Sequence, residues 1–284
     1  MKKISFFKMS GAGNDFVVID KDINPGFVPD QSIIKKICNR RYGIGADGII
    51  TVSNSSVYDF EMEYFNADGS TSLCGNGARC AIKFANLSGR IKSETAKFLS
   101  NGVNYSGKVL NDNEIKFFFN PPQRLKYNFQ IKASDQLITS CFVDTGSPHV
   151  VIKIDDVLKN PDDPKKFYDD LNDFPVIKIG REIRYNKDFA PEGTNVNFIR
   201  LVDGKIHIRT YERGVEDETF ACGTGSTAAA VIGSLLFNLK PPVYLITRGG
   251  DELIVDFKIE NQKFKDLSLT GPALVTFIGE FTLN

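Results

Sequence analysis

The sequence has few of the residues that build metal centres or disulfide frameworks. It contains only two histidines in 284 residues and no C-x-x-C spacing, so we expect no zinc or other metal site. Its cysteines are odd in number, and a chain of this length can bury a sizeable core without disulfides. We therefore expect free thiols in a reducing compartment at all five positions, Cys38, Cys74, Cys80, Cys141 and Cys222.

Net charge and long apolar segments are also absent. The 35 lysines and arginines balance the 35 aspartates and glutamates, which gives no electrostatic case for a nucleic acid or an anionic membrane as a partner. The longest apolar-rich run, residues 228–237, has half of the roughly 20 residues that a membrane-spanning helix needs. The N-terminal residues include two lysines but no long apolar stretch, so they predict a strand and a turn rather than a signal peptide. We expect a cytoplasmic protein.

The composition that remains is that of a globular protein in which strands outnumber helices. Hydrophobic residues make up 42% and charged residues 25%, as in ordinary folded domains. Residues 60–64 and 206–211 alternate between apolar and polar side chains, which is typical of half-buried strands. Further strands are predicted at residues 15–20, 115–119, 150–154, 196–202, 253–257 and 274–281.

Three helices are predicted. Asp30 is a candidate N-cap for a helix whose apolar stripe runs from Ile33 to Cys38. The segments Ala78–Leu87 and Thr227–Phe237 are the other two. Residues 160–172 contain two prolines and many charges, and we expect a surface loop with a short helix there.

An internal repeat suggests two similar domains. Residues 13–18 (GNDFVV) resemble residues 146–151 (GSPHVV), and residues 74–77 (CGNG) resemble residues 222–225 (CGTG). Both pairs occur in the same order, and each Cys-Gly-X-Gly motif precedes a small-residue helix, so chance is the weaker explanation. The segment Asn120-Pro121-Pro122 is a plausible linker, because proline interrupts both helices and β-ladders.

The two Cys-Gly-X-Gly motifs are the candidate catalytic elements. Glycine allows a close backbone approach and positive φ angles, and the first turn of a helix has unpaired N–H groups that favour anions such as a carboxylate. The same field favours the thiolate of a nearby cysteine. Two such sites could stabilise the charge that develops when a proton leaves a carbon beside a carboxylate. A thiolate and a thiol on opposite faces would then invert that carbon, and the two would titrate as a coupled pair.

The other cysteines and one histidine have a simpler interpretation. Cys38 lies on an apolar helix stripe, Cys80 lies within a predicted helix and Cys141 lies inside a strand, so we expect them to be buried packing residues. His207 is on the polar side of an alternating strand and is expected to face solvent.

The motifs together resemble those of the diaminopimelate epimerase family, nearly from end to end. The stretches that carry the resemblance are residues 7–16, 66–70, 74–80, 146–149, 212–214 and 221–226. The resemblance implies an α+β fold of two pseudo-symmetric domains, each a curved mixed β-sheet or barrel wrapped around a central helix. It implies an N-terminal domain of residues 1–122, completed by the C-terminal strand 273–284, and a C-terminal domain of residues 123–272.

The same resemblance implies an activity. Family members interconvert LL- and meso-2,6-diaminopimelate, in lysine and peptidoglycan precursor biosynthesis, without pyridoxal phosphate or a metal, and they form homodimers. By resemblance, Cys74 and Cys222 are the acid/base pair and His149 is a supporting polar residue. The implied substrate-binding residues are Asn14, Asn66, Gly75, Asn76, Ser147, Asn195, Glu212, Arg213, Gly223 and Thr224.

Physical chemistry agrees with these roles without requiring them. A guanidinium such as that of Arg213 can bind a carboxylate through two hydrogen bonds, but it could equally form a surface ion pair. Asn14 and Asn66 could instead bond their own backbone in turns. The chain departs from many members at Ser147, where asparagine is common, and at Gly48, where glutamine is common. The loop of residues 215–219 is one residue longer than in some members.

Three other functions were weighed against the epimerase. Proline racemase and hydroxyproline epimerase share the fold and the cysteine pair, but their cyclic substrates lack a distal ammonium group, which leaves Glu212 and Arg213 without a role. A binding protein that had lost the chemistry would be expected to lack one cysteine of the pair, and this chain has both. An oxidoreductase is not indicated, because no G-x-G-x-x-G follows a strand within a βαβ unit.

Overall fold

The computed structural model describes residues 2–283, which divide into two compact units. The first comprises the described residues up to Phe118 together with those from Thr270 onward, and the second comprises Phe119–Leu269. Within the described residues, no helix is both long enough and apolar enough to span a membrane.

The first unit is a mixed sheet to which both ends of the chain contribute. Its strands follow one another in the sheet in the order β17 (Leu274–Leu283), β1 (Lys2–Gly11), β2 (Asn14–Asp20), β3 (Gly48–Ser53), β4 (Phe60–Asn66), β5 (Ala96–Ser100), β6 (Val103–Val109) and β7 (Glu114–Phe118).

The second unit repeats this arrangement. Its strands follow the order β8 (Gln123–Ala133), β9 (Gln136–Asp144), β10 (Pro148–Lys153), β11 (Asn195–Val202), β12 (Lys205–Glu212), β14 (Val243–Ile246) and β15 (Glu252–Glu260). The short β13 (Asp217–Thr219) also pairs with β12, and β16 (Lys263–Pro272) follows β15 along the chain.

The directions of strand pairing repeat as well. From β17 to β6 the successive pairs are antiparallel, antiparallel, parallel, antiparallel, parallel and antiparallel. The pairs from β8 to β15 follow the same sequence of directions. The sequence repeat therefore corresponds to a repeated architecture, and the predicted α+β class with two similar halves is confirmed.

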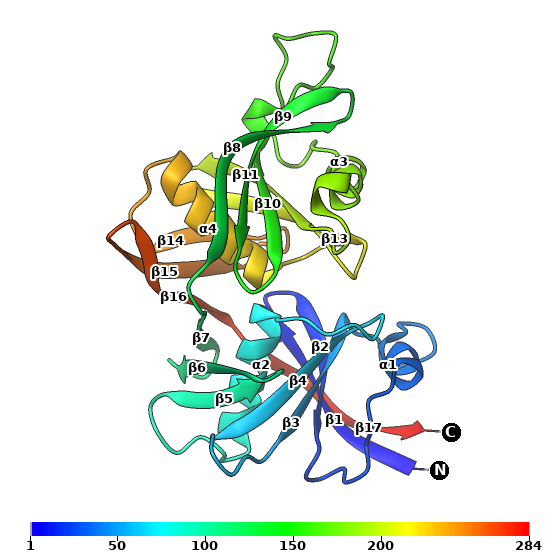
Figure 1. Ribbon diagram of the computed structural model, residues 1–284. Helices are drawn as coiled ribbons and strands as arrows, with labels where there is room; N and C mark the ends of the chain where they lie inside the picture. The colour runs from blue at the N-terminus through cyan, green and yellow to red at the C-terminus, as the bar shows by residue number, and fades with distance from the viewer. Residues whose placement is uncertain (1, 284) are drawn as a thin grey trace. The chain divides into compact units, whose positions relative to one another are not determined.

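One helix is central to each unit: α2 (Gly75–Leu87) in the first and α4 (Gly223–Leu236) in the second. In α2 the residues from Gly75 to Ala85 are all buried, and in α4 those from Gly223 to Ser234 are all buried. A helix that is buried on every side belongs to the interior of its domain. Accordingly, α2 packs against strands β1–β4, β6 and β7, and α4 packs against β9–β12, β14 and β15. Figure 1 shows α2 in cyan and α4 in orange, each among the strands of its own unit.

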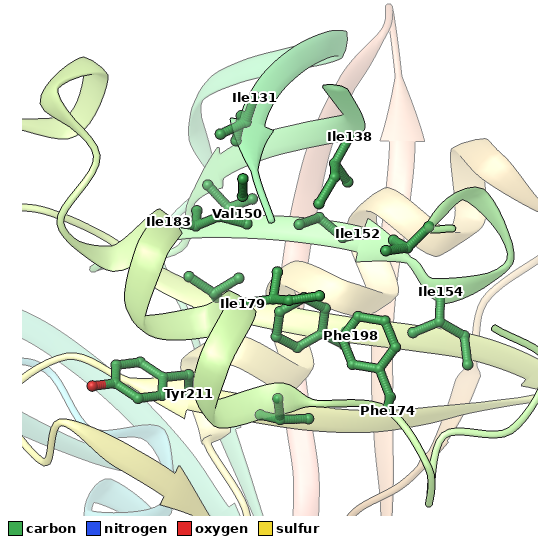
Figure 2. Close-up of a cluster of buried hydrophobic side chains, with 14 of the residues drawn as sticks. Ile131, Ile138, Val150, Ile152, Ile154, Phe174, Ile179, Ile183, Phe198 and Tyr211 are labelled. Carbon is green, nitrogen blue, oxygen red and sulfur yellow. The ribbon is translucent and has the colours of Figure 1, made fainter. Parts of the chain in front are cut away.

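A second helix in each unit connects two parallel strands. Helix α1 (Gln31–Cys38) connects β2 to β3, and Asp30 caps it by accepting a hydrogen bond from the Ile33 N–H at 2.9 Å. Helix α3 (Val176–Arg184) connects β10 to β11. Figure 2 shows Ile179 and Ile183 of α3 in a cluster of buried side chains that also contains Val150 of β10 and Phe198 of β11.

The helix predictions differ from the structure in four places, one of which is α3 (Val176–Arg184), a helix that the sequence does not predict. The short helix expected in residues 160–172 is wrong, because that segment forms turns and a single bridge between Leu158 and Phe167. Two short 3₁₀ helices flank this region, Ile154–Asp156 and Lys187–Phe189. The two central helices begin three and four residues earlier than predicted, at Gly75 and Gly223, because each cysteine side chain caps the helix directly.

Candidate active site

Cys74 and Cys222 occupy the same position in the two units, the N-cap of the central helix. Both have extended backbone angles, with φ −118° and ψ 111° at Cys74 and φ −127° and ψ 116° at Cys222. Each sulfur accepts a hydrogen bond from the backbone three residues on, at 3.3 Å from Gly77 N and at 3.4 Å from Gly225 N. Their exposed fractions are 8% and 6%. The sulfurs thus take the place that serine or aspartate oxygens take at ordinary helix starts.

The first turns of α2 and α4 are well suited to an anion. Neither turn contains an acidic side chain, so nothing on the helix neutralises the partial positive charge of its N-terminal N–H groups. The glycines do not adopt the positive φ angles that the motif suggested, because the helix includes them. At Gly225 the missing Cβ matters instead, since it would lie 2.4 Å from Asn197 Oδ1.

In the first unit Cys74 is linked to the turn that precedes β2. Its sulfur lies 3.6 Å from Asn14 Oδ1, which also accepts a hydrogen bond from Asn76 Nδ2 at 3.4 Å. The amide nitrogen of Asn14 donates to Asp47 Oδ2, so the oxygen of Asn14 is the atom that faces the cysteine. Three of the predicted site residues, Asn14, Cys74 and Asn76, therefore meet here.

A charged cluster that sequence reasoning missed holds Asn14 in place. Asp47 accepts the Asp15 N–H at 3.1 Å, and Arg40 bridges Asp15 and Asp47 at 2.7 Å each. Lys8 pairs with Asp15 at 2.5 Å. Burial and the nearby charge of Asp15 raise the pKa of Asp47. Burial would also raise the pKa of Asp15, but hydrogen bonds from Arg40 and Lys8 lower it overall.

Asn66 is bound within its own turn. Its Nδ2 donates to Ser70 Oγ at 2.9 Å and to Ser72 Oγ at 3.3 Å, and its Oδ1 accepts from Tyr64 Oη at 2.9 Å. Its Nδ2 also donates to the Ser70 carbonyl oxygen at 3.3 Å, which is the bond to nearby backbone that the turn-forming alternative predicts. Gly48, which is not among the predicted site residues, pairs with Asn66 across β3 and β4, and a Cβ there would lie 2.6 Å from the Tyr64 ring.

In the second unit Cys222 is joined to a chain of polar side chains. Its sulfur lies 3.5 Å from Thr224 Oγ1, and Ser147 Oγ lies 3.2 Å from the same hydroxyl and 2.9 Å from His149 Nε2. Burial, and then the positive charge of Arg213, lower the pKa of His149 to about 3, so this imidazole is neutral near pH 7. Ser147, His149, Thr224 and Cys222 are thus brought together as one group.

Asn197 extends this group and was not found from the sequence. It is fully buried on β11, and its Nδ2 lies 3.1 Å from His149 Nδ1 and 2.9 Å from the Val150 carbonyl oxygen. Its Oδ1 accepts a hydrogen bond from Thr210 at 3.0 Å. The available signal was its position two residues after Asn195, on the same face of a mostly apolar strand, where a buried amide requires partners.

The remaining predicted residues of the second unit gather at the ends of β11 and β12. Asn195 donates to the Pro148 carbonyl at 2.9 Å and accepts the Arg213 N–H at 2.9 Å, so it connects the first residue of β10 with the loop after β12. Burial and the nearby charge of Arg184 lower the pKa of Arg213. Glu212 Oε2 accepts a hydrogen bond from Thr219 at 2.8 Å.

The other three cysteines are buried thiols, as predicted. Burial raises the pKa of Cys38 and of Cys80 to about 12 and also raises that of Cys141, which keeps them protonated and unreactive. Among residues 2–283, no group of three or more His, Cys, Asp or Glu side chains is arranged to hold a metal ion.

Comparison with known proteins gives one consistent family. Residues 6–124 and 141–275 match the family model described as diaminopimelate epimerase. The diaminopimelate epimerase of Aquifex aeolicus is 37% identical, covering 98% of this chain and 98% of the relative. That of Chlorobaculum tepidum is 38% identical, covering 97% of this chain and all of the relative.

Solved structures share the fold at much lower identity. A phenazine biosynthesis protein of the PhzF family from Bacillus anthracis has a TM-score of 0.71 at 16% identity, with both chains fully covered. A hydroxyproline epimerase from Agrobacterium vitis has a TM-score of 0.71 at 13% identity, covering 98% of this chain and 92% of the other. At these identities the likeness concerns the fold alone.

Proposed function

Because the chain belongs to the diaminopimelate epimerase family, we propose that it converts LL-2,6-diaminopimelate into meso-2,6-diaminopimelate by a two-base mechanism. The observation that carries the mechanism is the equivalent placement of Cys74 and Cys222 as N-caps of two helices without acidic first turns. Each unit thereby offers one sulfur acid/base and one anion-binding helix start. The reaction belongs to lysine and peptidoglycan precursor biosynthesis.

The proposed reaction proceeds by two proton transfers. One cysteine, as a thiolate, removes the proton from the α-carbon and becomes a thiol. The electron pair delocalises into the α-carboxylate, whose developing charge is stabilised by the N–H groups of Gly75, Asn76, Gly223 and Thr224. The other cysteine, as a thiol, gives its proton to the opposite face of the carbon and becomes a thiolate. The centre is inverted, and the reverse reaction exchanges the roles.

The remaining residues of the proposed site bind and orient the substrate. Asn14, Asn66, Ser147 and Asn195 supply amide and hydroxyl groups, Arg213 would bind the distal carboxylate, and Glu212 would accept from the distal ammonium. The bond from the Arg213 N–H to Asn195 supports a common function for these two residues. His149 is a supporting residue. Ser147 is shorter than the asparagine of many members, and its hydroxyl lies against His149 and Thr224.

The test of the proposal is α-deuterium incorporation in deuterated water with no cofactor added. We expect LL-diaminopimelate to exchange and L-proline not to exchange. Cys74→Ser and Cys222→Ser should each lower the rate by about 10²–10⁴-fold, because serine is a far weaker acid and base at neutral pH. Cys141→Ala, at a buried thiol of the second unit, is the matched control and should retain activity. Full activity in either serine variant would contradict the two-base mechanism, and exchange of proline instead of diaminopimelate would contradict the substrate.

We also propose a cytoplasmic homodimer, in keeping with the biosynthetic role of the family. Size-exclusion chromatography with light scattering would test the dimer, and a monomer at working concentration would contradict it.

A further inference from the structure

The amide of Asn197 has one possible orientation. One side of the amide faces the Val150 carbonyl oxygen at 2.9 Å, and a carbonyl can only accept a hydrogen bond. The nitrogen must therefore be on that side, and the oxygen then accepts from the Thr210 hydroxyl at 3.0 Å. The second hydrogen of the same nitrogen points to His149 Nδ1 at 3.1 Å.

This orientation determines the tautomer of His149. The amide nitrogen can only donate, so Nδ1 must be the unprotonated ring nitrogen and Nε2 must carry the hydrogen. Burial and the charge of Arg213 keep the ring neutral, so Nδ1 has no hydrogen of its own to oppose that of Asn197. The hydrogen on Nε2 is directed at Ser147 Oγ, which lies at 2.9 Å.

The next two hydrogen bonds extend from Ser147 through Thr224 to the sulfur of Cys222, each donated in the same direction. Since Ser147 Oγ accepts from His149, its own hydrogen is available for Thr224 Oγ1 at 3.2 Å. The Thr224 hydroxyl, having accepted, donates in turn to Cys222 Sγ at 3.5 Å. Together with the Gly225 N–H at 3.4 Å, this gives Cys222 two donors, which favour its thiolate form. Hydroxyl chains of this kind polarise one another, so each bond strengthens the next.

The side chain that contacts Cys74 presents a hydrogen-bond acceptor to the sulfur, whereas the one that contacts Cys222 presents a donor. The atom that faces its sulfur at 3.6 Å is Asn14 Oδ1, an acceptor, because the nitrogen of Asn14 is directed at Asp47. Asp47 Oδ2 also accepts the Asp15 N–H at 3.1 Å. This second bond holds the carboxylate of Asp47 in place and thereby the side-chain amide of Asn14. An acceptor beside sulfur favours the thiol, whose hydrogen it can bind.

We propose that the resting enzyme carries its thiolate on Cys222 and its thiol on Cys74, and that Asn197 is the positioning residue that sets this state through His149, Ser147 and Thr224. The proposal rests on the proposed function for its catalytic meaning. It makes Cys222 the base for the first substrate molecule to bind, and it gives a reason for the polar residue buried in β11.

The test follows the rate of iodoacetamide alkylation of each cysteine against pH, with no substrate present, by peptide mass spectrometry. In the unmodified protein Cys222 should react at lower pH than Cys74. Ser147→Ala interrupts this series of hydrogen bonds, so the pH midpoint for Cys222 alkylation should rise by about one unit. At a fixed pH below the midpoint, this corresponds to about tenfold less thiolate. Cys74 in the same sample is the internal comparison: its midpoint should stay where it is or move to lower pH, opposite to that of Cys222, because the two thiols titrate as a coupled pair. Cys74 reacting first, or an unchanged Cys222 midpoint in Ser147→Ala, would overturn the proposal.

A second measurement reads the histidine directly. Nitrogen-15 spectra of histidine-labelled protein contain only His149 and His207, and His207→Gln assigns them. His149 should be protonated on Nε2. Asn197→Asp replaces the donor with an acceptor, so the proton should move to Nδ1 and the Cys222 midpoint should rise as in Ser147→Ala. Thr210→Val removes only the bond to Asn197 Oδ1 and should preserve the tautomer. A proton on Nδ1 in the unmodified protein would overturn the proposal even if Asn197→Asp does not fold.

These measurements need no turnover, so they are separable from the assay of function. A protein that titrates as expected but does not exchange deuterium into diaminopimelate would retain the Asn197 proposal and lose the proposed function. A protein that exchanges deuterium into diaminopimelate but is alkylated first at Cys74 would support the proposed function and contradict the Asn197 proposal.

Discussion

His149 is a histidine whose surroundings permit only one charge state. It is fully buried, it accepts from Asn197, and burial with the charge of Arg213 lowers its pKa from 6.5 to about 3. In the unfolded chain it binds a proton below about pH 6.5, whereas the folded protein binds none until about pH 3. Because the unfolded state binds more protons in this window, stability falls as the pH falls through it.

His149→Gln should therefore flatten the acid side of the stability profile. Between about pH 6.5 and pH 3, the free energy of unfolding of the unmodified protein should fall by up to about 1.4 kcal/mol for each pH unit of acidification. The variant lacks this contribution to the decrease. Urea unfolding at a series of pH values measures this difference. Above pH 7.5 both states carry a neutral ring, so the difference between the two proteins should be constant there. Parallel profiles down to pH 4 would show that His149 is protonated when folded.

At this scale the sequence predicts the cysteine pair and several of its neighbours, but not the residues that hold those neighbours in place. Cys74 and Cys222 are identified by a motif that repeats, and a motif of four residues is visible in the chain itself. Asn197, Arg40 and Asp47 owe their roles to contacts with residues 25 to 48 positions away in the chain. No local pattern specifies such contacts. The roles assigned to the substrate-binding residues stay predictions.

Helices α2 and α4 begin with the same motif, but they differ in the space available for a side chain at its second glycine. A Cβ at Gly225 would lie 2.4 Å from Asn197 Oδ1, whereas a Cβ at Gly77 would make ordinary contacts at 3.4 Å with Cys74 and Ile50. Asn197 cannot withdraw, because hydrogen bonds hold both ends of its amide. The close approach in the second unit is thus the reason for glycine there.

Gly225→Ala and Gly77→Ala form a matched pair that tests this difference. Gly225→Ala should lower the free energy of unfolding by about 1–3 kcal/mol, as overpacking does. Gly77→Ala should leave it unchanged or raise it by up to about 1 kcal/mol, since alanine favours a helix more than glycine. Midpoints of urea unfolding at constant slope measure both. Equal losses in the two variants would mean that the helix start, rather than Asn197, requires glycine.

At the level of elements, the sequence predicts best where periodicity is strong. The alternating strands β4 and β12 and the capped helix α1 lie where predicted. Helix α3 was missed, and a short helix was placed instead in the charged segment before it. Its apolar residues Val176, Ile179 and Ile183 have helical spacing, but α3 has only nine residues, contains Gly180 and has no side-chain cap. A helix this short depends on packing, here on β11 and β12, rather than on its own sequence.

At the scale of the whole chain, the first unit depends on residues from both ends. Strand β17 pairs with β1 from Lys2 to Ser10, and Thr276 donates a hydrogen bond to the Lys8 carbonyl at 2.9 Å. The ring of Phe277 contacts that of Phe6 at 5.9 Å. The internal repeat indicates two halves but not where the last strand pairs, and only the family resemblance predicts that strand in the first half. The domain boundaries placed at residues 122 and 272 stay a prediction.

Deleting residues 274–284 should therefore unfold the first unit selectively. Without β17, the backbone of β1 becomes an unpaired edge and the buried face of Ile4 and Phe6 loses its cover. Amides of β1 and β2 should lose protection from hydrogen exchange, read by mass spectrometry. Amides of β10 and α4 should keep it, because α4 packs against strands of the second unit. Thr276→Val, which removes one side-chain bond and keeps the strand, is the control and should retain protection throughout. Loss of protection in both units of the truncated chain would mean that the two fold as a single cooperative body, and the repeat would then describe ancestry rather than independent stability.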